Sequence, residues 1–164
     1  MYKALDVAMF IVQYCNDDNH WHYCSNLKLQ KLLYFVQVNF LLHSNGKRRC
    51  FREPIIALSW GPVVREVYNV FKVNGTCHIW DCKGKVVLSD DEDLWNSTYA
   101  YYEDVYIKEE DQELIIEIIE YFKDWSSPHL TDLTLKQTPW KNAYKIGEGE
   151  EITCEALYDY FKDE

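Results

Sequence analysis

Two groups of cysteine and histidine residues are the part of the sequence whose residue types could hold a metal ion. They are Cys15, His20, His22 and Cys24 in the first group, and Cys77, His78 and Cys82 in the second. Thiolate and imidazole are preferred zinc ligands, so the groups could form a site if the fold brought them together. Their spacing is not that of a zinc finger, and neither group contains a matching second pair. We therefore expect no metal site and interpret the first group as part of a loop between helices.

A cysteine beside a histidine could also act as a nucleophile, provided that a third group orients the histidine. Many such combinations are possible here, but no motif marks one of them. The six glycines form neither GxGxxG nor GxxxxGK, so no phosphate-binding loop is indicated. We expect a protein that is not an enzyme and needs no cofactor, with a metal- or thiol-dependent enzyme as the lesser alternative.

Charge is unevenly distributed along the 164 residues. Residues 1–89 contain 11 Lys+Arg and 6 Asp+Glu, a net charge of +5, whereas residues 90–164 contain 6 and 21, a net charge of −15. The overall charge of −10 argues against sequence-independent binding of nucleic acid, which requires neutralisation of phosphates. One cluster of basic residues could either form a local binding patch or simply be solvated surface charge. It comprises Lys47, Arg48, Arg49 and Arg52.

The sequence also bears on the cellular compartment. No apolar run approaches the ~18 residues of a membrane-spanning helix, and the N-terminus lacks the charged-then-apolar pattern of a signal peptide. The six cysteines are scattered, and 48% hydrophobic residues are enough to build a core without disulfides. We expect reduced thiols and a soluble intracellular protein with no membrane partner.

The elements that position these side chains are mostly helices, to judge from the spacing of apolar residues. The longest is expected to follow Ser25 as its N-cap, to run to about His43 and to form the centre of the core. Its apolar positions at helical spacing are Leu29, Leu32, Leu33, Val36 and Phe40.

Further helices are expected in five segments, at 4–16, 62–74, 109–125, 127–138 and from 153 onward. Pro62 suits the first position of the second of these, and Pro139 should end the helix that Ser127 and Pro128 open. The residues that follow Pro54 are compatible with either a strand or a short helix. Two apolar runs, 78–80 and 85–88, flank a turn and predict a β-hairpin. The fold class is therefore mainly α: a single-domain helical bundle of about six helices with a small β-hairpin, spanning residues 1–164.

Aromatic residues are in surplus between the hairpin and the helix at 109–125. They include Trp95, Tyr99, Tyr101, Tyr102 and Tyr106. Aromatic side chains are enriched among the anchors of protein interfaces. They also close over cores as packed lids, and both interpretations are open here.

Several short phrases in a fixed order carry a family resemblance. They are residues 4–8, Leu27–Tyr34 (Leu-Lys-Leu-Gln-Lys-Leu-Leu-Tyr), residues 53–57, Trp60-Gly61-Pro62-Val63 with Val67-Tyr68, residues 130–134, and Pro139-Trp140. Together they closely resemble the Panacea domain, the SocA-like antitoxin family of bacterial and prophage toxin–antitoxin systems. One departure is Leu135, which stands where the family usually has a histidine.

This resemblance implies a small, mostly helical antitoxin in the bacterial cytoplasm that neutralises a cognate toxin by direct binding. It also implies a second activity of some members, which deliver the toxin as adaptors to a Clp-type protease. A phage or prophage accessory protein of the same fold that binds a host protein is the alternative. The acidic second half would attract a basic toxin, an effect that salt would screen.

Eight polar-tipped or large residues of the shared phrases are candidates for partner binding. They are Lys28, Gln30, Lys31, Tyr34, Trp60, Arg65, Tyr68 and Trp140. The alternative is that they form a buried polar network between the central helix and the Trp-Gly-Pro turn, because buried polar groups must find partners.

Overall fold

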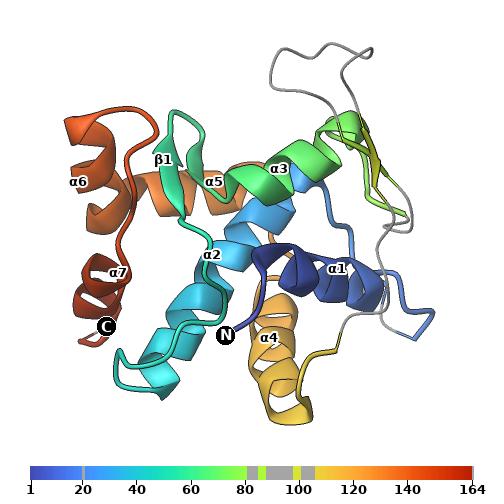
Figure 1. Ribbon diagram of the computed structural model, residues 1–164, viewed down its shortest axis with the longest axis horizontal. Helices are drawn as coiled ribbons and strands as arrows, with labels where there is room; N and C mark the ends of the chain where they lie inside the picture. Colours follow the sequence, from blue (N-terminus) through green and yellow to red (C-terminus); the bar gives the residue numbers. More distant parts are fainter. Residues whose placement is uncertain (20, 81–84, 88–97, 101–105, 164) are drawn as a thin grey trace.

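The computed structural model describes residues 1–19, 21–80, 85–87, 98–100 and 106–163. Its centre is α2 (Asn26–His43), around which most of the other helices pack (Figure 1). Ser25 caps α2 as predicted, because its hydroxyl accepts a hydrogen bond from the backbone N–H of Lys28. Fifteen of the 18 residues of α2 are buried, so this helix is enclosed on nearly all sides.

Six further α-helices lie within the described residues; five of them pack directly against α2, whereas residues 138–146 pack mainly against the helices before and after them. The six are α1 (Ala4–Cys15), α3 (Arg65–Phe71), α4 (Glu109–Tyr121), α5 (Ser127–Lys136), α6 (Thr138–Ile146) and α7 (Cys154–Phe161). A 3₁₀ helix, η1 (Lys72–Asn74), follows α3. In Figure 1, α4 and α7 lie on opposite sides of α2. The fold is mainly α, as the sequence predicts.

The described residues contain seven α-helices, one more than the prediction of about six, and the additional helix is α6, which begins beside Pro139. We expected this proline only to end the preceding helix, but Gln137 is extended (ψ 139°) and a new helix, α6, begins at Thr138. Proline suits the first turn of a helix because the N–H that it lacks has no intrahelical partner there. Pro139 therefore separates two helices and opens the second.

A short hairpin replaces the predicted start of the third helix. Strand β1 (Ile56–Leu58) pairs antiparallel with β2 (Gly61–Val63), so that Pro62 lies in a strand and α3 begins only at Arg65. The expectation of a helix starting at Pro62 is therefore wrong. Gly61 has a φ of +107°, which is incompatible with a helical start and places the turn instead.

The segment after α6 extends this hairpin. The backbone N–H of Ala57 donates to the carbonyl of Glu150, and the N–H of Gly149 donates back to Ala57. Ile152 N–H donates to Ile55 in the same way. The hairpin is thus hydrogen-bonded on its outer edge to a segment about 90 residues later in the chain.

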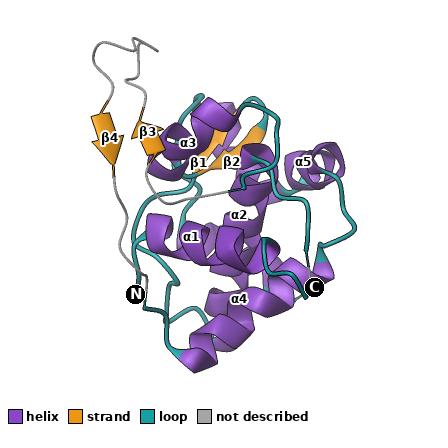
Figure 2. Ribbon diagram, turned by 90° about the vertical axis from the view of Figure 1, so that its right-hand side faces the viewer, coloured by secondary structure: helices purple, strands orange, loops and turns teal. Residues whose placement is uncertain are grey.

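The second hairpin also differs from the prediction. Strand β3 (Lys85–Val87) pairs antiparallel with β4 (Thr98–Ala100), not with residues 78–80 (Figure 2). Residues 78–80 instead lie against the N-terminus of α2, where Ile79 N–H donates to the carbonyl of Cys24. Of the aromatic surplus, Tyr99 lies in β4, Tyr106 is exposed, and Trp95, Tyr101 and Tyr102 lie outside the described residues.

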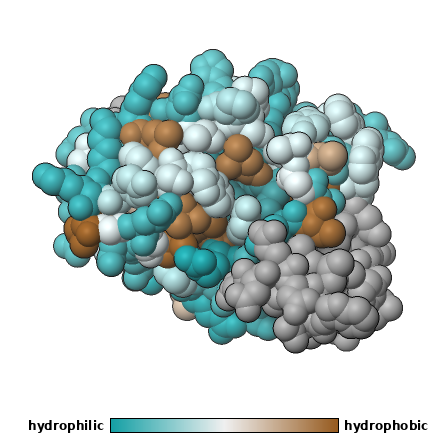
Figure 3. All heavy atoms as spheres, turned by 90° about the horizontal axis from the view of Figure 1, so that it is seen from above, coloured by the Kyte–Doolittle hydropathy of each residue, from teal (hydrophilic) through white to brown (hydrophobic). Residues whose placement is uncertain are grey.

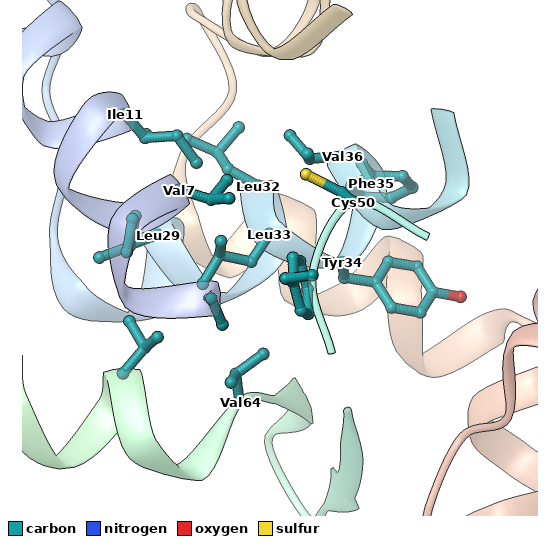
Figure 4. Close-up of a cluster of buried hydrophobic side chains, with 14 of the residues drawn as sticks. Val7, Ile11, Leu29, Leu32, Leu33, Tyr34, Phe35, Val36, Cys50 and Val64 are labelled. Carbon is teal, nitrogen blue, oxygen red and sulfur yellow. The ribbon is translucent and has the colours of Figure 1, made fainter. Parts of the chain in front are cut away.

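The helices share one hydrophobic core centred on α2. Side chains from α1, α2 and the start of α3 meet in it, including Val7, Leu29, Leu33 and Val64 (Figure 4). In the same view the hydroxyl of Tyr34 points away from this cluster, toward the ribbon of the later helices. The five described cysteines are free thiols. In the described part of the chain, no helix is both long and apolar enough to cross a membrane.

Candidate functional site

Lys31 is the most unusual side chain of the structure, because its ammonium group lies in the core. The residue is fully buried, and its Nζ donates to the carbonyl oxygens of Trp60 (2.9 Å) and Pro62 (3.1 Å). The same Nζ lies 5.5 Å from the centre of the Trp60 ring. Both oxygens are neutral, so the two bonds only partly offset the loss of hydration. Burial lowers the pKa of Lys31 to about 7.

Gly61 leaves the space that this lysine occupies. A Cβ on Gly61 would lie 2.7 Å from Nζ of Lys31 and 3.1 Å from the hydroxyl oxygen of Thr134. The positive φ of Gly61 also disfavours any side chain there. The Trp-Gly-Pro phrase therefore forms a turn that closes over the end of a buried lysine.

A second set of hydrogen bonds joins the start of α2 to α3. The amide of Gln30 accepts from the backbone N–H of Val64 (2.9 Å) and donates to the side chain of Asn26 (3.0 Å). Asn26 in turn donates to the carbonyl of Tyr68 (3.1 Å). Gln30 thus supplies a partner for the backbone N–H of Val64, the N-cap residue of α3.

Lys28 and Tyr34 join α2 to the later helices. Nζ of Lys28 donates to the carbonyl of Lys123 just after α4 (2.8 Å), and burial lowers the pKa of Lys28. The hydroxyl of Tyr34 donates to the side-chain oxygen of Gln137, between α5 and α6 (2.8 Å). Lys28, Gln30, Lys31 and Tyr34 are each at most 3% exposed, so none of the four forms a binding surface itself.

The other four candidates reach the surface to different extents. Trp60 and Tyr68 are partly exposed, their ring centres 4.9 Å apart, and they border a hollow of about 350 Å³. Arg65 is exposed at the start of α3. Trp140 donates from its indole N–H to the carbonyl of Leu58 (3.0 Å), which holds α6 against the first hairpin. Only part of the candidate set is therefore accessible to a partner.

Hydrophobic residues are scattered over one face of the molecule (Figure 3). On the face seen from above in Figure 3 they lie in several separate patches among hydrophilic residues. Among the predicted basic cluster, Arg48 is committed to an ion pair with Asp111 (2.6 Å), and Arg52 lies 3.6 Å from Glu53. Lys47 and Arg49 are exposed.

The two Cys/His groups meet, but their polar atoms have other partners. Nδ1 of His78 accepts from the backbone N–H of Cys24, and its Nε2 lies 2.8 Å from the amide oxygen of Asn16. Hydrogen bonding with Cys15 and complete burial raise the pKa of the Cys24 thiol. His22 contacts Glu120 instead (2.9 Å). Within the described residues, no three such side chains are placed to hold a metal ion; His20 and Cys82 lie outside them.

The fold and the network define a mainly helical protein in which one buried helix holds a Trp-Gly-Pro hairpin through its lysine, glutamine and tyrosine side chains. Residues 29–141 match the family described as "Antitoxin SocA-like, Panacea domain". The chain belongs to this antitoxin-like family. No curated protein and no solved structure matches the chain.

The match begins at Leu29 and ends at Lys141, so it includes most of α2, the first hairpin, α4 and α5. These are the elements that the buried network joins. Lys28, Gln30, Lys31 and Tyr34 were candidates from the sequence, whereas Asn26 and Gln137 were not. Asn26 and Gln137 are hydrogen-bonded to named members, yet neither lies in a phrase that marked it.

Proposed function

We propose that the chain neutralises a protein toxin by binding it directly, without chemistry of its own. The observation that supports this proposal is the match to the SocA-like antitoxin family over residues 29–141. The buried network fits a binding protein, since Lys31, Gln30 and Tyr34 hold backbone and side-chain groups of their own chain instead of facing a cleft.

In this proposal the eight candidate residues divide into two roles. Lys28, Gln30, Lys31 and Tyr34 act indirectly, because they are buried and fix the position of the hairpin, α3 and the later helices. A partner can touch the exposed parts of Trp60, Tyr68, Arg65 and Trp140. Substitutions in the first group should therefore lower stability, whereas substitutions in the second should chiefly weaken binding. Trp140 is the exception, because its indole N–H also holds α6 against the first hairpin, so its substitution should lower stability as well.

Charge supports a basic partner. Residues 90–164 carry a net charge of −15, and six acidic residues lie in the 13-residue helix α4. Opposite charges on two proteins raise the rate of association, and salt screens the effect. We expect the association rate of the toxin to fall as salt rises.

Binding and degradation are two separate steps of the proposal. Occlusion of the toxin needs only this chain, whereas delivery to a Clp-type protease would also shorten the lifetime of the toxin. Measuring toxin half-life with and without this chain, in cells with and without the protease, separates the two. A half-life that is unchanged assigns neutralisation to binding alone.

Growth rescue tests the proposal as a whole. The product of each gene adjacent to that of this chain is expressed alone and then together with it in a bacterial host. The expected result is that one product stops growth and that this chain restores it and co-purifies with it. If no neighbour is toxic and a defined host protein co-purifies instead, the phage accessory alternative replaces the antitoxin proposal.

A further inference from the structure

An apolar groove of about 430 Å³ runs along the C-terminal half of α2, between α4, α5 and α7. The helices that flank it, α4 and α7, lie on opposite sides of α2 in Figure 1. Its apolar lining includes Phe35, Val38, Phe122, Trp125, Leu133 and Phe161. It is separate from the hollow at Trp60 and Tyr68, with which it shares no lining residue.

Five of the eleven residues that line the groove are aromatic. The ring centres of Phe35 and Phe122 are 4.5 Å apart, and those of Phe122 and Trp125 are 5.5 Å apart. Tyr121 stands at the rim, packed against Phe122 and 69% exposed. Aromatic residues packed in this way, with one ring left open to solvent, are the usual anchors of protein interfaces.

The buried network reaches this groove. Gln137 lines it, and the side-chain oxygen of Gln137 accepts the hydrogen bond from Tyr34. Asn39 also lines it and donates to the carbonyl of Leu114 and to the carboxylate of Glu117, which fixes α2 against α4. Asn39 and Tyr34 of α2 therefore help to fix the positions of α4 and of the segment between α5 and α6, which border the groove.

The rim along α4 is acidic. Glu117 and Asp124 are exposed beside the lining residues Ile118 and Trp125, and α4 itself contains six acidic residues and no lysine or arginine. The exposed lysine just after α4, Lys123, lies 3.4 Å from the carboxylate of Glu120 and so offsets one of these charges. A second copy of this chain that packed groove to groove would bring a second acidic rim against the first, and like charges at close range repel. The rim instead complements a segment that carries lysine or arginine beside its apolar residues.

We propose that this groove receives an amphipathic helix of the cognate toxin, with large apolar residues on one face and basic residues on the side that meets α4. Such a helix places anchors at positions i, i+3 or i+4, and i+7, which an apolar groove between helices accommodates. The proposal rests on the proposed function, since it names the part of the toxin that this antitoxin binds.

A pair of synthetic peptides tests the groove without knowledge of the toxin. The first is a helix of ~16 residues, about 24 Å long, with leucine at the anchor positions and lysine elsewhere. The second keeps the leucines and replaces each lysine with glutamate. Each labelled peptide is titrated with the full chain, and fluorescence anisotropy is measured at low and high salt. Tyr121→Ala and Glu117→Lys alter the groove and its rim. Their matched controls are Tyr106→Ala and Glu155→Lys, at exposed positions that do not line it.

The expected result is that the lysine peptide binds the wild-type chain and binds each groove variant about tenfold more weakly or worse, with both controls unchanged. Equal binding of the two peptides at all salt concentrations, or equal binding by wild type and groove variants, would overturn the proposal. So would a concentration-dependent dimer that Tyr121→Ala disrupts, since a second copy would then occupy the groove.

Growth rescue separates this proposal from the proposed function. If wild type rescues growth and Tyr121→Ala does not, at equal thermal stability, both stand. If wild type and Tyr121→Ala rescue growth equally, the proposal that the toxin binds in the groove is wrong, while the antitoxin function stands. If wild type fails against every neighbouring gene product, the antitoxin function is wrong, and this proposal fails with it.

Discussion

The buried ammonium group of Lys31 makes a specific prediction about pH. Burial lowers its pKa from 10.5 to about 7, so between these values the folded chain holds the lysine neutral while the unfolded chain holds it charged. Folding then releases a proton, and the free energy of unfolding rises with pH across this interval. The stabilisation is complete above pH 10.5, is lost as pH falls from 10.5 to about 7, and is absent below.

The size of the effect follows from the two pKa values. Between pH 6 and pH 9 the lysine contributes a rise of about 2.7 kcal/mol in the free energy of unfolding. This is an upper bound, because the carbonyl oxygens of Trp60 and Pro62 favour the charged form and raise the pKa again.

The contribution of Lys31 to the free energy of unfolding is measured by urea unfolding of wild type and Lys31→Met at several pH values. Other groups titrate in this range in both proteins, so the difference between the two isolates Lys31. We expect wild type to gain stability relative to Lys31→Met as pH rises from 6 to 9. Parallel curves would show that Lys31 stays charged throughout, in which case the two carbonyl bonds outweigh burial and our reasoning is wrong.

Three further predictions concern single contacts. Gly61→Ala should destabilise the chain by about 2 kcal/mol or more, because it adds a clash with Nζ of Lys31 to the strain of a positive φ. Gly75→Ala is its control, with a positive φ but open space, and equal losses in urea unfolding would refute the clash. Tyr34→Phe should cost about 1–2 kcal/mol in the same assay, since it leaves the buried oxygen of Gln137 without its donor; an unchanged midpoint would contradict this. Glu120 accepts hydrogen bonds from His22 and Tyr14 that lower its pKa to about 2, so its contribution is present above pH 4.5 and lost as pH falls toward 2. Glu120→Gln should flatten this acid limb of thermal stability, and an acid limb as steep as that of wild type would count against it.

Local signals predicted most of the helices correctly. Ser25 caps α2 as predicted, and α1, α4 and α7 lie within the segments 4–16, 109–125 and from 153 onward in which helices were expected. These features depend on residues within one or two turns of each other, so a single sequence contains them in full.

Pairing between distant segments was not predictable in this way. Gly61-Pro62 fits a helix start and a tight turn equally well, and the choice depends on Lys31 and on the segment near Glu150. A strand of three residues has too short an alternation of apolar and polar residues to identify its partner. Strand β3 was therefore expected to pair with residues 78–80 instead of with β4.

The candidate site shows the same limit. Lys28 and Lys31 are polar residues on a helix that is buried on nearly every side, and polarity alone suggests exposure. Their burial follows from acceptors contributed by Lys123, Trp60 and Pro62, residues that no periodicity within α2 identifies. The groove likewise exists only once four helices have packed.

The hydrogen bonds between the first hairpin and residues 149–152 have a consequence for synthesis of the protein. A ribosome releases α2 and the hairpin before Lys123, Gln137 and Glu150 have been made, so Lys28 and Tyr34 of α2 and Ala57 of the hairpin have to wait for their acceptors. Contacts of such long range form slowly, and a chain that waits exposes apolar surface to proteases and chaperones. A chain truncated before Lys123 would leave the donors of Lys28, Tyr34 and Ala57 without these acceptors, and we expect it to be degraded faster than the 164-residue chain.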